Sequence, residues 1–129
     1  MSADGVAREP RILVLEDEPI ILMDLAFAIE GAGALPLRAR STAEALAAIE
    51  DNTPDVAVLD VNLGRNSTCR EVAERLRTMG VPFILHSGDL HRQGELIATL
   101  GAEVVPKPTP SPHVVRKALS LIRPEGEEG

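Results

Sequence analysis

Apolar residues in this chain fall into short runs that alternate with longer stretches of helical spacing. The first run, residues 11–15 (RILVL), predicts a β-strand. Apolar residues then recur every three or four positions over 21–29, which predicts an amphipathic helix. Pro19 stands where the first turn of that helix would begin, a position that tolerates its missing N–H. Gly31 and Gly33 predict where the helix ends.

The same alternation of strand and helix signals continues to the end of the chain. Residues 35–39 predict a weaker strand, and Ser41 or Thr42 opens the next helix. Glu44 is positioned to complete a capping box with Ser41. The run 55–60 (DVAVLD) predicts a strand buried on both faces. The remaining predicted elements are a loop over 64–67, a helix opened by Ser67 or Thr68 and closed by Gly80, a strand over 81–86, a helix over 93–100 ended by Gly101, a strand over 102–105, and a last helix from Ser111 or Pro112 through Ile122.

Five predicted strands, each followed by a helix, indicate a parallel sheet with helices on both faces. Residues 11–123 are expected to form this one domain. Residues 1–10 are expected to be a flexible N-terminal segment, and the acidic stretch 124–129 (PEGEEG) a flexible tail. In such a sheet the functional groups gather at the carboxyl ends of the strands.

Composition narrows the possible partners. The 129 residues carry a formal charge of −7, which argues against nucleic-acid binding through basic residues. No apolar run approaches the ~20 residues that span a bilayer, so no membrane partner is expected. The first ten residues lack the apolar core of a signal peptide. The single cysteine, Cys69, cannot form an internal disulfide, and we therefore expect a cytoplasmic protein.

Polar residues at the predicted strand ends form a chemically coherent set. Glu16 and Asp17 follow the first strand, Asp60 the third, Ser87 the fourth and Lys107 the fifth. Carboxylates brought this close repel one another. A Mg²⁺ ion, which prefers oxygen ligands, would resolve that conflict. The sequence therefore predicts a magnesium site at this edge of the sheet.

These residue types also suit phosphoryl transfer to a carboxylate. An aspartate beside a metal can act as a nucleophile towards phosphorus. Lys107 offers a positive charge to phosphoryl oxygens, and Ser87 offers a hydroxyl donor. We therefore expect Asp60 to accept a phosphoryl group.

The chain resembles the receiver domains of response regulators in two-component signalling, of the stand-alone type, from Arg11 to about Arg123. The resemblance rests on the order and spacing of four stretches, ILVLEDEP, DVAVLDVNLG, FILHSG and VVPKP. It implies a flavodoxin-like (CheY-like) fold, a doubly wound five-stranded parallel sheet with helices on both faces. It also implies a signalling phospho-acceptor and not an enzyme. The implied partners are a histidine kinase or histidine phosphotransfer protein and an unidentified downstream protein.

The resemblance implies a role for each residue of the metal site. Asp60 would be the phospho-acceptor and a Mg²⁺ ligand. Asp17 would bind the metal directly, Glu16 mainly through water, and Asn62 through its backbone carbonyl. Asn62 and Asp89 would flank the path of a hydrolytic water, so both are candidates for tuning the phosphoryl lifetime.

The resemblance also implies how the phosphoryl group is held and where this chain departs from the family. Ser87 and Lys107 would contact the phosphoryl group, and the Lys107–Pro108 peptide bond would be cis. Receivers commonly carry an aromatic switch residue three positions before this lysine, and here the position is Val104. Transmission of the signal in its common form is therefore not expected.

Two other functions remain open from the sequence. The first is a small phosphatase or phosphotransferase of the aspartyl-phosphate class, but such enzymes generally need a second aspartate where this chain has Asn62. The second is a degenerate receiver that binds partners without phosphorylation. The complete set of acidic, hydroxyl and lysine groups argues against it, whereas Val104 keeps it open.

Some prominent residues are expected to have no chemical role. His86, His91 and His113 are interpreted as surface or boundary histidines and not as a metal site. Cys69 is expected to be a partly buried helix residue, and Met23 is expected to fill the core.

Overall fold

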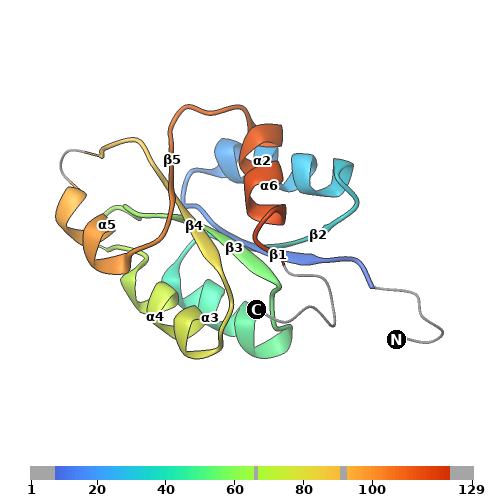
Figure 1. Ribbon diagram of the computed structural model, residues 1–129, viewed down its shortest axis with the longest axis horizontal. Helices are drawn as coiled ribbons and strands as arrows, with labels where there is room; N and C mark the ends of the chain where they lie inside the picture. Colours follow the sequence, from blue (N-terminus) through green and yellow to red (C-terminus); the bar gives the residue numbers. More distant parts are fainter. Residues whose placement is uncertain (1–7, 66, 91–92, 123–129) are drawn as a thin grey trace.

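The computed structural model describes residues 8–65, 67–90 and 93–122 (Figure 1). Its centre is one sheet of five parallel strands in the order β2-β1-β3-β4-β5. Each neighbouring pair is parallel and in continuous register, for example Leu13 with Leu37 and Val58 with Ile84. The strands are β1 (Arg11–Leu15), β2 (Leu35–Ala39), β3 (Val56–Asp60), β4 (Phe83–Ser87) and β5 (Val104–Pro106).

Helices cover both faces of this sheet (Figure 1). The helices α2 (Pro19–Gly31) and α6 (Ser111–Leu119) pack together on one face. The other face is covered by α3 (Thr42–Asp51), α4 (Arg70–Thr78) and α5 (Gly94–Leu100). The predicted flavodoxin-like, doubly wound fold is therefore confirmed.

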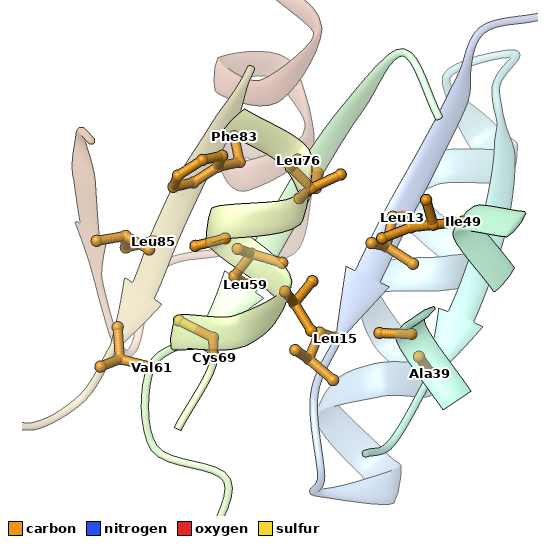
Figure 2. Close-up of a cluster of buried hydrophobic side chains, with 14 of the residues drawn as sticks. Leu13, Leu15, Ala39, Ile49, Leu59, Val61, Cys69, Leu76, Phe83 and Leu85 are labelled. Carbon is orange, nitrogen blue, oxygen red and sulfur yellow. The ribbon is translucent and has the colours of Figure 1, made fainter. Parts of the chain in front are cut away.

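Two hydrophobic cores hold these layers together, because alternate side chains of each strand point to opposite faces. On the α3–α4–α5 side, Leu59 and Leu85 pack with Leu76 of α4 (Figure 2). On the α2–α6 side, Val58 and Ile84 pack among residues of both helices. Fully burying a side chain of this size contributes about 1.5–3 kcal/mol. All five residues of β3 are buried, as its apolar sequence predicted.

Local signals in the sequence explain where two helices start. Pro19 occupies the first position of α2. Ser41 caps α3, and its Oγ accepts a hydrogen bond from the Glu44 N–H at 3.2 Å. The Glu44 carboxylate accepts from the backbone N–H of Arg40, at 2.8 Å, and not from that of Ser41 as the capping box predicted. The Ser41 cap is therefore present, but the Glu44 carboxylate accepts from the residue before the cap and not from the cap itself.

Several predicted boundaries are wrong by one to three residues. The strand β4 begins at Phe83 and not at 81 because Pro82 has no N–H to donate to the sheet. The helix α4 begins at Arg70 and not at Ser67 or Thr68, since Thr68 is held in an isolated antiparallel bridge with Asn62. The other corrected limits are the start of β3 at Val56, the end of β4 at Ser87, the start of α5 at Gly94, the extent of β5 from Val104 to Pro106, and the end of α6 at Leu119.

Three expectations about burial are also wrong. Met23 is 65% exposed and does not fill the core. His86 is only 4% exposed, so it is neither a surface nor a boundary residue. Cys69 is completely buried, and burial raises the pKa of its thiol to about 12. His113 is exposed as expected, and His91 lies outside the described residues.

Candidate functional site

Three carboxylates meet at the carboxyl ends of two adjacent strands. Glu16 and Asp17 directly follow β1, and Asp60 is the last residue of the neighbouring strand β3. The three side chains each offer an oxygen, and these oxygens lie within 4.8 Å of one another. Glu16 and Asp60 are buried, at 1% and 4% exposed, and Asp17 is half-buried. The parallel register therefore gathers the predicted acidic residues into one cluster.

Lys107 brings a positive charge into this cluster from the loop after β5. Its Nζ lies 3.0 Å from Oε1 of Glu16 and 3.5 Å from Oδ1 of Asp60. The backbone holds the lysine in place, because the Lys107 N–H donates to the carbonyl of Ser87 at 2.9 Å. The Lys107–Pro108 peptide bond is cis, as the family resemblance implied.

Burial and crowding change the protonation of the cluster. Burial raises the pKa of Asp60 to about 8, and the nearby charge of Glu16 adds to this effect, while Lys107 opposes it. Burial works against the ammonium of Lys107, but the carboxylates of Asp60 and Glu16 outweigh it and raise the pKa of this lysine. In the absence of a further cation, Asp60 therefore takes up a proton more readily than an ordinary aspartate.

The donor set fits a hard divalent cation. Oε1 of Glu16 is buried and has no partner with hydrogen-bond geometry among the described residues, although Nζ of Lys107 lies 3.0 Å away. Mg²⁺ typically takes one or two carboxylates from a protein, and water and phosphate oxygens complete its shell. Gly64 has a φ of +79°, and a Cβ there would lie 3.4 Å from Oδ2 of Asp17. The loop after β3 therefore passes beside the carboxylate of Asp17.

A polar hollow of about 190 Å³ opens beside Asp60, and Asn62, Ser87, Lys107 and Asp89 line it. The hydroxyl of Ser87 accepts a hydrogen bond from the backbone N–H of Asp89 at 3.2 Å. The structure therefore brings every residue of the predicted site to the acidic cluster or to this hollow. Their roles in binding and chemistry remain predictions.

Glu18 also lines the hollow, and sequence reasoning did not include it in the site. Its backbone N–H donates to Oε2 of Glu16 at 3.2 Å, so the two residues are linked through the turn that precedes α2. The signal that could have identified it is its place in the run Glu16-Asp17-Glu18.

Comparison with solved structures finds close matches over most of the chain. A CheY-like receiver domain protein from Methanospirillum hungatei JF-1 has a TM-score of 0.76 and is 23% identical, covering 87% of this chain and 92% of its own. The HemR receiver domain from Leptospira biflexa has a TM-score of 0.74 and is 28% identical, covering 90% and 98%. SdrG from Sphingomonas melonis Fr1 has a TM-score of 0.73 and is 32% identical, covering 89% and 97%. The chain belongs to the CheY-like response regulator receiver domains.

No protein-family model and no curated protein matches this chain. Its acidic cluster and the half-buried Lys107 accompany the fold. A receiver domain implies a partner in two-component signalling, and such domains are typically phospho-acceptors rather than enzymes. None of the helices that the structure describes is long and apolar enough to cross a membrane.

Proposed function

We propose that this receiver domain accepts a phosphoryl group on Asp60 from the phosphohistidine of a histidine kinase or histidine phosphotransfer protein, in a Mg²⁺-dependent reaction. It then signals through contacts with another protein. The observation that carries this proposal is the position of Asp60, whose carboxylate lies beside those of Glu16 and Asp17 and 3.5 Å from Nζ of Lys107. A carboxylate in this setting is accessible from the polar hollow and has a cation within reach.

The proposed reaction is a direct displacement at phosphorus. A carboxylate oxygen of Asp60 forms an O–P bond, and the P–N bond of the phosphohistidine breaks. The bonding electron pair stays on the imidazole nitrogen of the donor. With a small phosphodonor such as acetyl phosphate, a P–O bond breaks instead and acetate leaves. Asp60 must be ionised for this attack, so its raised pKa has to be overcome.

The surrounding residues would supply the charge and hydrogen bonds that this displacement needs. Asp17, Glu16 through water, Asp60 and the backbone carbonyl of Asn62 would hold Mg²⁺. The ion, when bound, would favour the ionised form of Asp60 and offset the charge of the phosphoryl oxygens. Nζ of Lys107 would turn from Asp60 towards a phosphoryl oxygen.

Ser87 would complete the contacts to the phosphoryl group. Its Oγ accepts from the N–H of Asp89, and its own proton remains available to donate to a phosphoryl oxygen. The hydroxyl and the lysine approach from the two strands that follow β3 in the sheet, β4 and β5.

Incubation with Mg²⁺ and acetyl phosphate is expected to add the mass of one phosphoryl group, as measured by intact-protein mass spectrometry. Asp60→Asn should remain unmodified, and EDTA should abolish the mass shift in the wild type. Asp55→Asn is the matched control, because Asp55 lies at the opposite end of β3, where it pairs with Arg8. If the wild type stays unmodified, the degenerate receiver is favoured. If Asp60→Asn gains the mass of a phosphoryl group, the phospho-acceptor is a residue other than Asp60.

The phosphoryl lifetime is expected to depend on Asn62 and Asp89, which both line the hollow beside Asp60. A side chain there can orient or block the water that hydrolyses the acyl phosphate. We expect Asn62→Ala and Asp89→Ala to change the dephosphorylation rate by about threefold or more, which is about 0.7 kcal/mol in barrier height. Loss of ³²P from the isolated phosphoprotein measures this rate. Rates equal to the wild type in both variants would contradict the assignment.

A further inference from the structure

Glu18, the residue before α2, is exposed and lies beside the proposed phosphoryl site. It occupies the N-cap position of this helix, but its side chain makes no capping hydrogen bond. Serine, threonine, aspartate and asparagine are preferred there, because their short side chains reach the N–H groups of the first turn. Among the residues that the structure describes, none pairs with the Glu18 carboxylate through a hydrogen bond or an ion pair. The charge of Glu18 is therefore open to interaction with a bound molecule.

The polar hollow beside Asp60 has a buried floor and an exposed rim. Asp60 and Ser87 form the floor, at 4% and 3% exposed. Glu18, Asn62 and Gly88 are exposed residues that line the same hollow and form its rim. The volume of the hollow is about 190 Å³, whereas sites for whole small molecules typically measure about 300–1,000 Å³. The hollow therefore has room for a phosphoryl group, and the rest of a phosphodonor lies at the rim.

Glu18 lies on the side of the hollow from which a leaving group must depart. In an in-line displacement the attacking and leaving atoms stand on opposite sides of phosphorus. Because Asp60 attacks from the floor, the leaving atom points towards the rim. The charge of Glu18 acts within this hollow. Burial works against the ammonium of Lys107, but nearby carboxylates outweigh it and raise the pKa of this lysine, Asp60 most strongly and Glu18 to a smaller extent.

Phosphodonors differ in the charge that they place at this rim. A phosphohistidine whose second ring nitrogen is protonated presents a cationic ring with an N–H donor. When its P–N bond breaks, the electron pair stays on nitrogen and a neutral imidazole leaves. Acetyl phosphate presents no positive charge, and its P–O bond breaks to release the anion acetate. A carboxylate at the rim attracts the cationic ring and repels the departing acetate, and such repulsion is an effective source of specificity.

We propose that Glu18 is a specificity-determining residue, which favours phosphorylation of Asp60 by protonated phosphoimidazole groups and disfavours phosphorylation by acyl phosphates. This inference rests on the proposed phosphorylation of Asp60, and it names the class of phosphodonor that the site selects. The Glu18 carboxylate accepts a hydrogen bond from the protonated ring nitrogen of the donor. The same carboxylate raises the barrier for an acyl phosphate, because negative charge develops on the leaving oxygen at the rim.

The charge of Glu18 also has a structural effect, which must be separated from selection of the donor. A carboxylate before the first turn of a helix stabilises the helix through its dipole. Loss of this effect changes the phosphorylation rates with all donors by the same factor. The decisive quantity is therefore the ratio of two phosphorylation rates measured on one protein at one pH, because the stability of the fold and the ionisation of Asp60 cancel from it.

The experiment measures initial phosphorylation rates with N-phosphoimidazole and with acetyl phosphate, both below saturation, in Mg²⁺ and at a pH that keeps the donor ring protonated. Intact-protein mass spectrometry gives both rates. Glu18→Gln is expected to speed the reaction with acetyl phosphate but not that with phosphoimidazole, which shifts the ratio of the rates by about threefold or more. Glu18→Asp keeps the charge and should retain most of the wild-type preference. Added salt should move the wild-type ratio towards that of Glu18→Gln, because it screens exposed charges.

Glu30→Gln is the matched control, since it removes the same charge from an exposed position at the other end of α2. At about 1.5 Å per residue, Glu30 lies roughly 18 Å from Glu18 along the helix, beyond the screening length of about 8–10 Å. An unchanged ratio in Glu18→Gln, or an equal change in Glu30→Gln, would overturn the inference and leave the proposed function intact. If neither donor phosphorylates the wild type, the proposed function fails, and the inference fails with it.

Discussion

Replacing Lys107 with methionine is expected to lower the free energy of unfolding by about 3–5 kcal/mol at pH 8, the cost of breaking a buried charge pair. Among the described residues, Nζ of Lys107 is the only cationic group within 4 Å of the carboxylates of Glu16 and Asp60. Methionine retains much of the apolar stem but removes the charge. Urea denaturation in EDTA measures the loss, which should be smaller at pH 6, where Asp60, with its pKa of about 8, takes up a proton.

A second lysine provides the control for this prediction. Nζ of Lys117 lies only 2.7 Å from Oε2 of Glu103, but both side chains are 47% exposed. Lys117→Met should therefore cost less than about 1 kcal/mol, as exposed ion pairs do. Mg²⁺ should recover part of the stability lost in Lys107→Met, because the ion restores positive charge beside the carboxylates. Equal losses in the two variants, or no recovery with Mg²⁺, would contradict this account of the cluster.

The fold and the composition of the site were predictable because buried parallel strands have a simple signature. Four of the five strands, β1, β3, β4 and β5, contain a short apolar run, and a polar residue at or just after its end marks the functional edge of the sheet. Asp60 and Lys107 are 47 positions apart, yet their place at strand ends was enough to bring them together in the prediction. No long-range information beyond the order of elements was needed.

Features that depend on a distant partner could not be predicted from local pattern. The start of α4 was misplaced because Thr68 bridges to Asn62, which the sequence around Thr68 does not reveal. The prediction that Met23 is buried was wrong for a related reason. Both Leu22 and Met23 are apolar neighbours on α2, and only the packing of the helix against the sheet decides that Leu22 is buried and Met23 exposed.

His86 illustrates the same limit at the site itself. The sequence predicted a surface or boundary residue, but the burial of His86 depends on α2 and α6, which cover this face of the sheet. A histidine interrupts the apolar pattern of a buried strand, so the sequence alone does not predict that it is buried. The burial of His86 is therefore visible only in the structure.

Asp60→Asn is expected to raise the free energy of unfolding by about 2–4 kcal/mol at pH 8 in EDTA, whereas Lys107→Met lowers it. Burial and the charge of Glu16 raise the pKa of Asp60 from 3.8 to about 8 in the folded protein. Between these two values the folded state binds more protons than the unfolded state, so the stability of the wild type falls as the pH rises. Asparagine has no proton to lose and avoids that penalty.

The pH dependence separates this electrostatic cause from a packing effect. The difference in unfolding free energy between Asp60→Asn and the wild type should be small near pH 4, grow up to about pH 8, and then level off. Glu9→Gln, at an exposed position before β1, should show no such trend. Mg²⁺ should narrow the difference, since an ion bound to the acidic cluster stabilises the folded wild type by mass action. A stabilisation that is independent of pH would show that burial and the charge of Glu16 do not disfavour the ionised carboxylate of Asp60. The argument for a cation at this cluster would then be weaker.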